Sequence, residues 1–385
     1  MKTIAVIFGG RSAEHDVSIV TAHIPIIDTL LASKEYDVWP VYISKDGKWY
    51  ADKEMNNLSF FKQQDYESAL AAKKQVQLSF ENGLDFVWSG MFGKRVHIDV
   101  VFPAMHGTYG EDGALMGLLK MANVPFVGCD VAASAVAMDK VLTKQVVAAE
   151  GIPVVPYVWF TRDEWKKNAP EYRARIKKLR SPLFVKPVHL GSSIGITKVK
   201  EEVELENAIE IALHFDDKVL VEEGVQNLIE VTLPIMGNGE PRVAECERPL
   251  NKTDFFDFKD KYLSGGKKGG AGANVPYSEV PANIGESLTR RVKEMGKEVY
   301  RALGCTGIAR VDFLIDGSTD TVYVNEVNTL PGSLYHHNWK KAGVSNMDLV
   351  TGLVTLAEER FSAQKDTKRI FQSDILQKVG GPKLQ

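Results

Sequence analysis

Four polar residues in the last quarter of the chain have the types and the spacing of a metal and phosphate site. Arg310 and Asp312 stand two positions apart in one apolar segment, and Glu326 and Asn328 stand two apart in the next. Both segments are rich in β-branched and aromatic residues, and the turn-forming residues 317–320 separate them, which predicts an antiparallel hairpin. Because side chains alternate between the faces of a strand, each pair shares a face, and the hairpin can bring the two pairs together.

The chemistry that this set supports is magnesium binding beside a phosphate group. Two carboxylates and an amide oxygen are hard ligands, and Mg²⁺ usually takes one or two carboxylates plus substrate phosphates. The alternative is a solvated polar face on an exposed hairpin, which the hairpin alone does not exclude. Residues elsewhere in the chain have to decide between the two interpretations.

A lysine followed by a loop of small residues is the second candidate. The segment FVKP predicts a strand that ends near Lys186, and GSSIG follows at 191–195. Backbone N–H groups in such a loop can approach phosphate oxygens, and the lysine adds positive charge. A simple Gly-Ser hairpin turn is the alternative, and the chain contains no GxxxxGK[ST] phosphate loop.

Two further loops follow predicted strands in the N-terminal part. GGRSAEH ends the first strand and contains Glu14, whose carboxylate can bind an amine, and HGTYGEDG begins at His106. Ligands of open α/β sheets bind beyond the carboxyl ends of the strands, so both loops point to one crevice. Each loop alone is more often a simple strand-to-helix turn. Lys140, in a predicted helix, and Glu222, at the end of a predicted strand, are weaker single candidates.

Composition limits the class of protein. At 385 residues the chain is longer than one hydrophobic core usually supports, so two or three domains are expected. The 47 basic and 50 acidic residues give a net charge of −3, which offers no electrostatic case for nucleic acid or an anionic membrane. Cys129, Cys246 and Cys305 form no CxxC pair, so neither a disulfide framework nor a zinc site is expected. No apolar stretch approaches the roughly 20 residues of a membrane span, and we expect a cytoplasmic protein.

The predicted elements divide the chain into parts. Strands alternate with helices over about the first 130 residues, which predicts an open, mostly parallel sheet, and residues 154–235 have the α+β pattern of a small separate domain. The expected strands are 3–8, 37–43, 97–103, 124–127, 154–160, 183–187, 195–199, 219–223, 229–236, 242–248, 306–315 and 321–327. The expected helices are 13–32, 112–121, 134–151, 161–179, 201–214, 283–303 and 346–360.

Taken together and in this order, the motifs resemble the D-alanine–D-alanine ligases of the ATP-grasp superfamily. The resemblance covers nearly all of residues 2–358. Its specific segments are GGRSAEHDVS at 9–18, HGTYGEDGALMG at 106–117, SAVAMDK at 134–140, FVKP and GSSIG within 184–195, KYLSG at 261–265, RVDF at 310–313 and NEVNTLPG at 325–332.

The resemblance implies an α/β and α+β architecture with the ATP-grasp fold. ATP would be held between the last two of three domains, with Mg²⁺ as cofactor, two ions being expected and Mn²⁺ being an alternative. The implied parts are a Rossmann-like N-terminal domain (1–130), a small central domain (131–235), a C-terminal domain (236–360) and a tail of unreadable role (361–385). Residues 261–275, rich in glycine and lysine, would form a lid loop over the site.

The resemblance also implies roles for single residues. The ATP contacts would be Lys140 and Lys186 on the phosphates, Ser192 and Ser193 in the adjoining loop, Glu222 and the Val225 backbone on adenine, and Glu230 on the ribose. The metal ligands would be Asp312, Glu326 and Asn328. The amino-acid substrates would meet Glu14, His106, Lys261, Arg310, Gly332 and His337.

The implied reaction joins two D-amino acids through an acyl phosphate, most simply D-alanine to D-alanine for a cell-wall precursor. Glu14 would hold the ammonium group of the first substrate. Ser192 and Tyr262 would join Glu14 in a hydrogen-bonded network around the attacking amine. Arg310 and the Gly332 N–H would stabilise the tetrahedral oxyanion, and removing such a donor typically costs on the order of 10²–10³ in rate.

The segment after Pro331 and Gly332 departs from the family's pattern. A threonine-containing turn is usual there, with a serine four or five residues on that helps hold the carboxylate of the second substrate. Here His337 stands about where that serine belongs, directly after His336, whose role is not readable. We therefore expect either an acceptor other than D-alanine, or D-alanine held through an imidazole or through Lys261.

Several alternatives stay open at this point. The same acyl-phosphate chemistry could use another amino acid, a hydroxy acid or an amine as acceptor. A nucleotide-binding protein without catalysis is a rival, which the joint presence of Glu14, Lys186, Arg310 and Asp312 argues against. A carboxylase-type grasp enzyme fits the first two loops poorly. The resemblance suggests a homodimer joined through the N-terminal domain, and potassium activation is only a family expectation.

Overall fold

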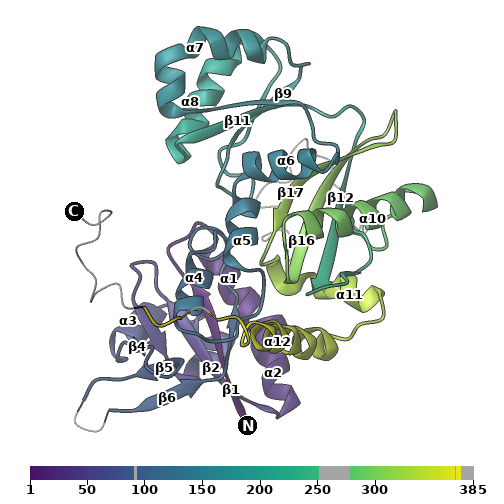
Figure 1. Ribbon diagram of the computed structural model, residues 1–385. Helices are drawn as coiled ribbons and strands as arrows, with labels where there is room; N and C mark the ends of the chain where they lie inside the picture. The colour runs from purple at the N-terminus through teal and green to yellow at the C-terminus, as the bar shows by residue number, and fades with distance from the viewer. Residues whose placement is uncertain (91–92, 251–277, 369, 374–385) are drawn as a thin grey trace, which may run out of the picture.

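The computed structural model describes residues 1–90, 93–250, 278–368 and 370–373. These residues form three four-stranded sheets with helices packed against them, and two smaller sheets (Figure 1). In the view of Figure 1 the first sheet lies at the bottom, the second at the top and the third between them. The mixed α/β and α+β class predicted from the sequence is confirmed.

The first sheet has the strand order β3-β2-β1-β7 and is built from N-terminal residues. Its central strand β1 pairs in parallel with β2 and β7, while β3 runs antiparallel to β2. From Ile4 to Phe8, β1 is an unbroken buried apolar run, as expected for a strand covered on both faces. The four strands are β3 (Trp49–Ala51), β2 (Tyr36–Ile43), β1 (Lys2–Gly9) and β7 (Val100–Pro103).

A helical segment packs on this sheet immediately after β1. It runs without interruption through α1 (His15–Thr21), the π-helical turn η1 (Ala22–Ile27) and α2 (Asp28–Ser33). Pro25 lies inside the π-helical turn. A proline cannot donate the usual helical hydrogen bond and clashes with the carbonyl four residues earlier, so a locally widened turn accommodates it.

The same segment, His15–Ser33, is long and apolar enough to cross a membrane by length and composition alone. The expectation that no apolar stretch reaches this length is therefore wrong. However, 61% of its most apolar window is buried inside the protein. Most of its apolar residues pack inside the protein, with Val20, Ile24 and Leu31 exposed, so the segment is weak evidence for a membrane span.

Smaller elements complete the N-terminal part. Two short 3₁₀ turns and a helix follow β3, the strands β4-β5-β6 form a small antiparallel sheet, and one helix follows the loop that contains His106. These elements are η2 (Lys53–Asn56), η3 (Leu58–Phe60), α3 (Tyr66–Ala71), β4 (Gln77–Ser79), β5 (Leu84–Val87), β6 (Arg95–Ile98) and α4 (Ala114–Met121).

The second sheet, β10-β9-β11-β8, is antiparallel throughout and has its own buried core. Two helices, α7 and α8, pack against it at the top of Figure 1. Its elements are β8 (Tyr157–Thr161), α7 (Arg162–Ile176), β9 (Leu183–Pro187), β10 (Thr197–Val199), η4 (Glu202–Glu204), α8 (Leu205–Phe215) and β11 (Lys218–Glu223).

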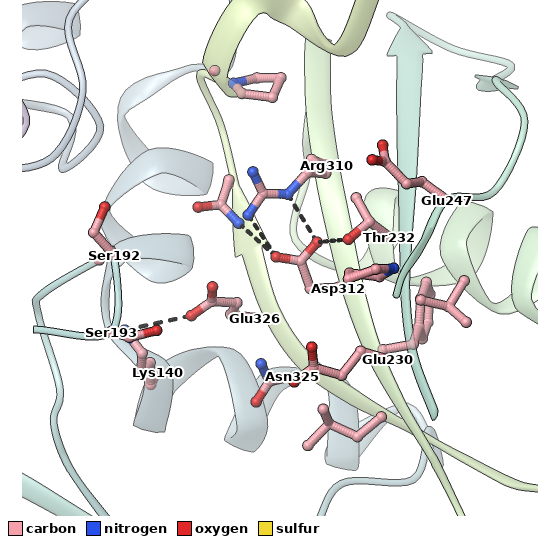
Figure 2. Close-up of a pocket in the computed structure, with 18 of the residues that line it drawn as sticks. Lys140, Ser192, Ser193, Glu230, Thr232, Glu247, Arg310, Asp312, Asn325 and Glu326 are labelled. Carbon is pink, nitrogen blue, oxygen red and sulfur yellow. Dashed lines mark hydrogen bonds and ion pairs between the residues drawn. The ribbon is translucent and has the colours of Figure 1, made fainter. Parts of the chain in front are cut away.

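The third sheet, β13-β12-β16-β17, contains the predicted hairpin. Its antiparallel register places Arg310 opposite Asn328 and Asp312 opposite Glu326, so the predicted hairpin is confirmed and the two polar pairs are neighbours (Figure 2). A β-bulge follows Asp312, between this residue and Phe313. The strands are β12 (Leu228–Gly237), β13 (Arg242–Val243), β16 (Gly307–Asp316) and β17 (Thr321–Asn328), and a separate two-stranded sheet joins β14 (Arg248–Pro249) to β15 (Ser278–Glu279).

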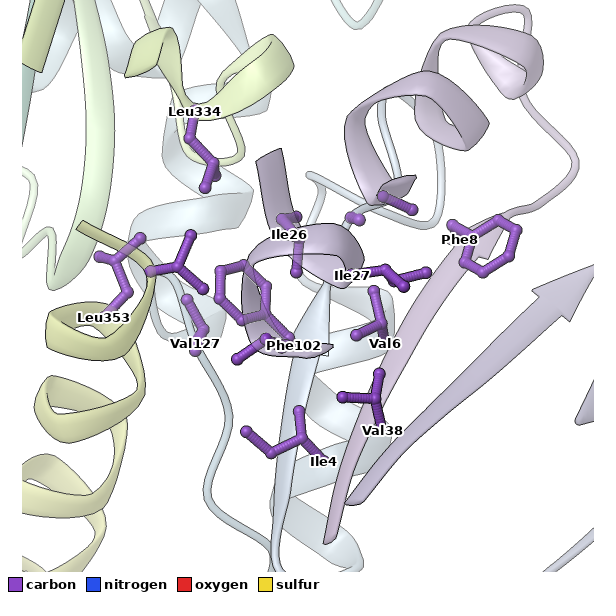
Figure 3. Packing of buried hydrophobic residues seen from close by; sticks show 14 of the residues in the cluster. Ile4, Val6, Phe8, Ile26, Ile27, Val38, Phe102, Val127, Leu334 and Leu353 are labelled. Carbon is purple, nitrogen blue, oxygen red and sulfur yellow. The ribbon is translucent and has the colours of Figure 1, made fainter. Parts of the chain in front are cut away.

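Helices from distant parts of the chain cover the third sheet and join it to the first. Helices α5, α6 and α10 share a buried core with β12, β16 and β17. Helix α12 packs between the first and third sheets. Its Leu353 shares one buried cluster with Ile4, Phe102 and Val127 of the N-terminal part and with Ile308 of β16 (Figure 3). The helices are α5 (Val131–Met138), α6 (Lys140–Ala149), α10 (Glu286–Ala302), α11 (His336–Lys341) and α12 (Asn346–Ala363), with the 3₁₀ turn η5 (Gly332–Tyr335) before α11.

One predicted helix is wrong in a way that concerns the site. The expected helix 134–151 is broken at Asp139, whose backbone is extended and whose side chain caps α6 by accepting hydrogen bonds from the N–H groups of Val141 and Leu142. Lys140 therefore stands in the first turn of α6, not in the middle of a helix. An aspartate in front of a new apolar run is a standard N-cap signal, which the continuous pattern concealed.

Several predicted strands are also shorter, shifted or divided: 195–199 is reduced to β10, Thr197–Val199, and 154–160 is observed as β8, Tyr157–Thr161. The expected strand 97–103 is interrupted at Asp99, which exchanges hydrogen bonds with Thr3. Residues 124–127 contribute only an isolated bridge to Val101, and the expected strand 242–248 is replaced by the two short strands β13 and β14. The division of the chain at 130, 235 and 360 stays a proposal. The boundary at 235 falls inside β12, and this whole strand pairs with β16 of the third sheet.

Candidate active site

A cavity of about 450 Å³ lies where the three sheets meet. Figure 2 shows Lys140, Ser192 and Ser193 on one side of it and Glu230 and Glu247 on the other. Each candidate residue from the sequence that falls in the described ranges lines this cavity: Glu14, His106, Lys140, Lys186, Ser192, Ser193, Glu222, Val225, Glu230, Arg310, Asp312, Glu326, Asn328, Gly332 and His337. Lys261, Tyr262 and the expected lid 261–275 lie outside the described residues.

The hairpin places an ion pair at the centre of the cavity. Arg310 donates from Nε to Asp312 Oδ1 at 2.8 Å and from Nη2 to Asp312 Oδ2 at 2.6 Å. Thr232 Oγ1 and Asn328 Nδ2 also donate to this carboxylate, at 3.0 and 3.3 Å. Although burial opposes its charge, Asp312 raises the pKa of Arg310 well above its usual value. The set is therefore a fixed, partly buried charge pair and not a solvated face, which rejects the alternative interpretation of the hairpin.

Two lysines approach this hairpin from other elements. Lys140 donates from Nζ to the Leu190 carbonyl at 2.6 Å, and its ammonium group lies 3.6 Å from Glu326. Lys186, on β9, is paired with Glu222 on β11. Both lysines therefore line the cavity, and each lies beside a carboxylate, Glu326 or Glu222.

Glu222 is almost completely buried between two lysines. In addition to Lys186, its carboxylate pairs with Lys144 Nζ at 2.8 Å. Burial alone would raise the pKa of Glu222, but Lys144 and Lys186 lower it to about 2, so the group is ionised at neutral pH. A hydrogen bond from adenine to Glu222 would have to share these oxygens with the lysines, and this expected role stays a prediction.

The loop after β9 brings the phosphate and amine candidates together. Ser192 Oγ donates to Glu14 Oε1, a contact between residues 178 positions apart. Ser192 and Ser193 both have positive φ angles, 55° and 57°, which are sparsely populated for residues other than glycine. Such strained conformations persist only where the surroundings fix them, and they cluster at functional sites. Two members of the expected Glu14–Ser192–Tyr262 network are thus in contact.

His106 and Glu111 form a buried polar corner beside Glu14. His106 hydrogen-bonds to Thr21 Oγ1 through Nε2 at 2.8 Å, and burial lowers the pKa of this histidine. Glu111 accepts a hydrogen bond from the Gly107 N–H at 2.7 Å. Burial, together with the charge of Glu14, raises the pKa of Glu111 to about 8. At neutral pH, His106 and Glu111 therefore both favour their uncharged forms beside Glu14.

The turn after Pro331 forms the remaining wall. Ser333, Leu334 and Tyr335 all have positive φ angles of 48–53°, and the Tyr335 ring lies 5.0 Å from the Arg310 guanidinium carbon. His337 Nε2 lies 2.8 Å from Glu247 Oε2. Although burial opposes it, this contact lowers the pKa of Glu247. The histidine that departs from the family's pattern is therefore paired with a buried carboxylate in the cavity wall.

Sequence reasoning missed four residues of this site. Lys144 stands one helical turn after Lys140, so an i, i+4 pattern of lysines on α6 was its signal. Glu111 belongs to the HGTYGEDG segment, which was singled out as a whole. Glu247 and Tyr335 carried no local signal, because their roles depend on contacts with residues 90 and 25 positions away, His337 and Arg310.

Two family models match most of the chain. The model described as D-ala D-ala ligase N-terminus matches residues 3–129, and the one described as D-ala D-ala ligase C-terminus matches residues 146–355. A D-alanine–D-alanine ligase from Chloroherpeton thalassium is 36% identical over 374 residues, covering 94% of this chain and 98% of the relative. Another from Thermosipho melanesiensis is 37% identical over 365 residues, covering 95% and 96%.

Solved structures agree with these matches. The D-alanine–D-alanine ligase from Coxiella burnetii superposes with a TM-score of 0.79 at 30% identity, covering 94% of this chain and 96% of that one. The VanG D-Ala:D-Ser ligase from Enterococcus faecalis superposes with a TM-score of 0.76 at 33% identity, covering 92% and 99%. The similarity therefore extends over all three sheets.

Proposed function

The chain belongs to the D-alanine–D-alanine ligase family, and we propose from this premise that it joins two D-alanine molecules in an ATP-dependent reaction. The observation that carries the proposal is the shared cavity. Within it, the Glu14–Ser192 pair, the lysines Lys140 and Lys186 and the Arg310–Asp312 pair all face one space. These are an amine site, a phosphate site and an oxyanion site, which is the set of groups that ligation through an acyl phosphate needs.

The nucleotide would lie between the second and third sheets. We assign its phosphates to Lys140, Lys186 and the backbone of the Ser192–Ser193 loop. The adenine and ribose would lie along the cavity wall that contains Glu222, Val225 and Glu230. The two serines lie in a tight turn with positive φ angles, and successive backbone N–H groups of such turns can bind an anion.

The donor set of the hairpin fits Mg²⁺. Asp312 and Glu326 face each other across the register, and carboxylate and amide oxygens are the hard ligands that Mg²⁺ prefers. Asn328 would have to present its amide oxygen, since its Nδ2 now faces Asp312. A bound Mg²⁺ would neutralise negative charge on the phosphate groups of ATP, including the phosphoryl group that is transferred. We propose two such ions, with Mn²⁺ as a substitute.

In the first step, a carboxylate oxygen of one D-alanine attacks the γ-phosphorus of ATP, ADP leaves, and an acyl phosphate forms. Lys140 and Lys186 offset the charge on the transferring phosphoryl group. Glu14 holds the ammonium group of this D-alanine, with His106 beside it. Enclosure protects the acyl phosphate from water, and we assign that task to residues 261–275, which lie outside the described residues.

In the second step, the deprotonated amine of the second amino acid attacks the acyl carbonyl, and phosphate leaves from the tetrahedral intermediate. The developing oxyanion meets Arg310 and the Gly332 N–H. Because the pair with Asp312 uses Nε and Nη2 of the guanidinium, we assign the oxyanion contact to Nη1. Ser192, with Tyr262, would accept the proton from the attacking amine and relay it to Glu14.

The acceptor pocket decides what the second amino acid is. We propose D-alanine, with its carboxylate held by the His337 imidazole that Glu247 orients. D-serine is the second candidate, because one superposed structure is a D-Ala:D-Ser ligase and because Glu247 offers a carboxylate to an acceptor hydroxyl. A peptidoglycan precursor as product, a homodimeric assembly and a cytoplasmic location follow from the family and remain predictions.

The test is phosphate release from Mg-ATP with D-alanine alone, then with D-alanine plus a panel of second amino acids, with products identified by mass. L-Alanine serves as the control for chirality. Turnover with D-alanine alone that yields the dipeptide supports the main proposal. Turnover only after D-serine or another compound is added would transfer the proposal to that acceptor. ATP binding without turnover on any compound would favour a nucleotide-binding protein that lacks catalysis.

A further inference from the structure

His189 lies between two carboxylates at the edge of the nucleotide site. It belongs to the segment that joins β9 to the Ser192–Ser193 loop. Its Nδ1 lies 3.0 Å from Asp216 Oδ1, and its Nε2 lies 3.3 Å from Asp139 Oδ2. Its backbone N–H also donates to Asp216 Oδ2 at 2.7 Å. The imidazole thus bridges the end of α8 to the start of α6.

The residues next to His189, in sequence and in space, also contact Lys140. Asp139, which the ring contacts, caps α6 and directly precedes Lys140. The carbonyls on either side of His189, those of Val188 and Leu190, accept hydrogen bonds from the backbone N–H and the Nζ of Lys140, at 3.4 and 2.6 Å. His189 therefore connects Asp139, which caps α6, to residues 188–190, whose carbonyl groups accept the hydrogen bonds from Lys140.

The charges around the ring favour its protonated form. The facing groups are Asp139 and Asp216, with the exposed Asp217 nearby and Lys218 paired to Asp139 at 2.7 Å. The hydrogen bonds with Asp139 and then Asp216 raise the pKa of His189 to about 9. An imidazolium donates from both nitrogens, whereas neutral imidazole donates from only one. At neutral pH the ring can therefore hold both carboxylates at once.

We propose that His189 is a positioning residue for nucleotide binding, which fixes the first turn of α6 against the loop after β9 and so sets the place of the Lys140 ammonium group. The inference rests on the proposed function, because Lys140 is assigned there to the ATP phosphates. His189 does not line the cavity, and it acts through Asp139 and the carbonyls of Val188 and Leu190. Its ring is accessible to solvent, so it can respond to pH: 42% of its side chain is exposed, against 9% of Asp139.

The first experiment compares His189→Ala and His189→Gln with the wild type in the full-length protein. His214→Gln, an exposed histidine on the adjoining α8, is the matched control. We expect the His189→Ala variant to raise both the ATP KM and the Kd of a non-hydrolysable ATP analogue about tenfold, the effect of one charged hydrogen bond. The KM for D-alanine should stay within twofold, and His214→Gln should change neither constant. His189→Gln retains one donor and should lie between the two.

Equal effects on both substrates, or an unchanged ATP KM in a folded variant, would overturn the inference. Binding of the ATP analogue is measured separately from turnover, so a wild type that binds it without ligating would contradict only the proposed function. A second measurement needs no variant: NMR titration of the wild-type histidine rings should place one imidazole, His189, near pH 9. A His189 that titrates near its ordinary value of about 6.5 would show that the two carboxylates do not hold it.

Discussion

His337 Nε2 lies 2.8 Å from Glu247 Oε2, and this contact joins the first turn of α11 to the residue that precedes β14 in the lining of the cavity. Glu247 is 7% exposed and is fixed through its backbone, which exchanges two 2.9 Å hydrogen bonds with Thr232. The imidazole is therefore oriented by a carboxylate that cannot move freely. Because Nε2 contacts Glu247, the second ring nitrogen, Nδ1, is the one that we assign to the acceptor carboxylate.

Replacing His337 tests this assignment. We expect His337→Ala to raise the KM for the second D-alanine about 10- to 100-fold, because a hydrogen bond to a charged group is lost. The KM for ATP should change little, which provides the internal control. His337→Ser restores the residue type that is usual in the family and should recover most of the loss. Steady-state kinetics at saturating ATP separate these cases, and an unchanged second-substrate KM in His337→Ala would remove the histidine from the acceptor pocket.

The Arg310–Asp312 pair should matter for both catalysis and stability. In Asp312→Asn the guanidinium keeps its burial but loses its charged partner, which should lower the free energy of unfolding by about 3 kcal/mol. We also expect kcat to fall on the order of 10²-fold or more. Asp320→Asn is the matched control, since Asp320 is exposed in the turn of the same hairpin and asparagine tolerates its positive φ.

Urea unfolding and initial rates on the same preparations give both quantities. A full-rate Asp312→Asn enzyme would contradict the placement of the metal and phosphate site on this hairpin. A variant that loses stability but keeps its rate would show a purely structural role for the pair.

The buried lysines beside Glu222 lead to a second stability prediction. Glu222→Gln leaves Lys144 and Lys186 without their anionic partner, and we expect it to cost about 3–5 kcal/mol of unfolding free energy. Glu206→Gln removes an exposed ion pair with Arg173 and should change the unfolding free energy far less. The depressed pKa of Glu222 means that its contribution is present above its unfolded pKa and is lost as pH falls from about 4.5 towards 2. Equal denaturation midpoints for the two variants would rule out the buried ion-pair network.

Glu111 should give the protein an opposite pH dependence. Its folded-state pKa of about 8 lies above the unfolded value near 4.5, so the folded state binds the extra proton between these values. The stability of the folded state should therefore fall as pH rises through this window and level off above about 8. Glu111→Gln, which mimics the protonated carboxyl group, should lose this dependence. Chemical denaturation of both proteins at pH 5, 6, 7 and 8 tests it, and parallel curves would mean that Glu111 is ionised throughout.

The hairpin and its polar pairs could be predicted from the sequence because their contacts are local. Residues 310–328 contain both strands, the turn and the alternation that sets which side chains share a face. The turn sets the register only as far as Phe313 opposite Val324. The β-bulge after Asp312 then shifts the register by one residue and places Asp312 opposite Glu326, and the sequence pattern did not predict this bulge. Glu14 and Ser192 could each be predicted as site residues because they lie in loops that follow strands. Their contact with each other was expected only from the resemblance to the family.

Other parts of the site depend on contacts that no local pattern records. The pairing of Glu247 with His337 joins residues 90 positions apart, and the raised pKa of Glu111 comes from burial that the tertiary fold creates. The break before Lys140 was missed for another reason. The apolar periodicity of residues 134–151 continues through Asp139, so only the capping role of this aspartate distinguishes two helices from one.

The central claim is that ligation proceeds through an acyl phosphate of D-alanine, and isotope transfer tests it most directly. D-Alanine labelled with ¹⁸O in its carboxylate is incubated with Mg-ATP, and the phosphate and dipeptide are analysed by mass. The account predicts D-alanyl-D-alanine and one ¹⁸O in each phosphate released with it, because the attacking carboxylate oxygen leaves with the phosphoryl group. Dipeptide formed with unlabelled phosphate, or with the label in AMP, would contradict the acyl-phosphate route.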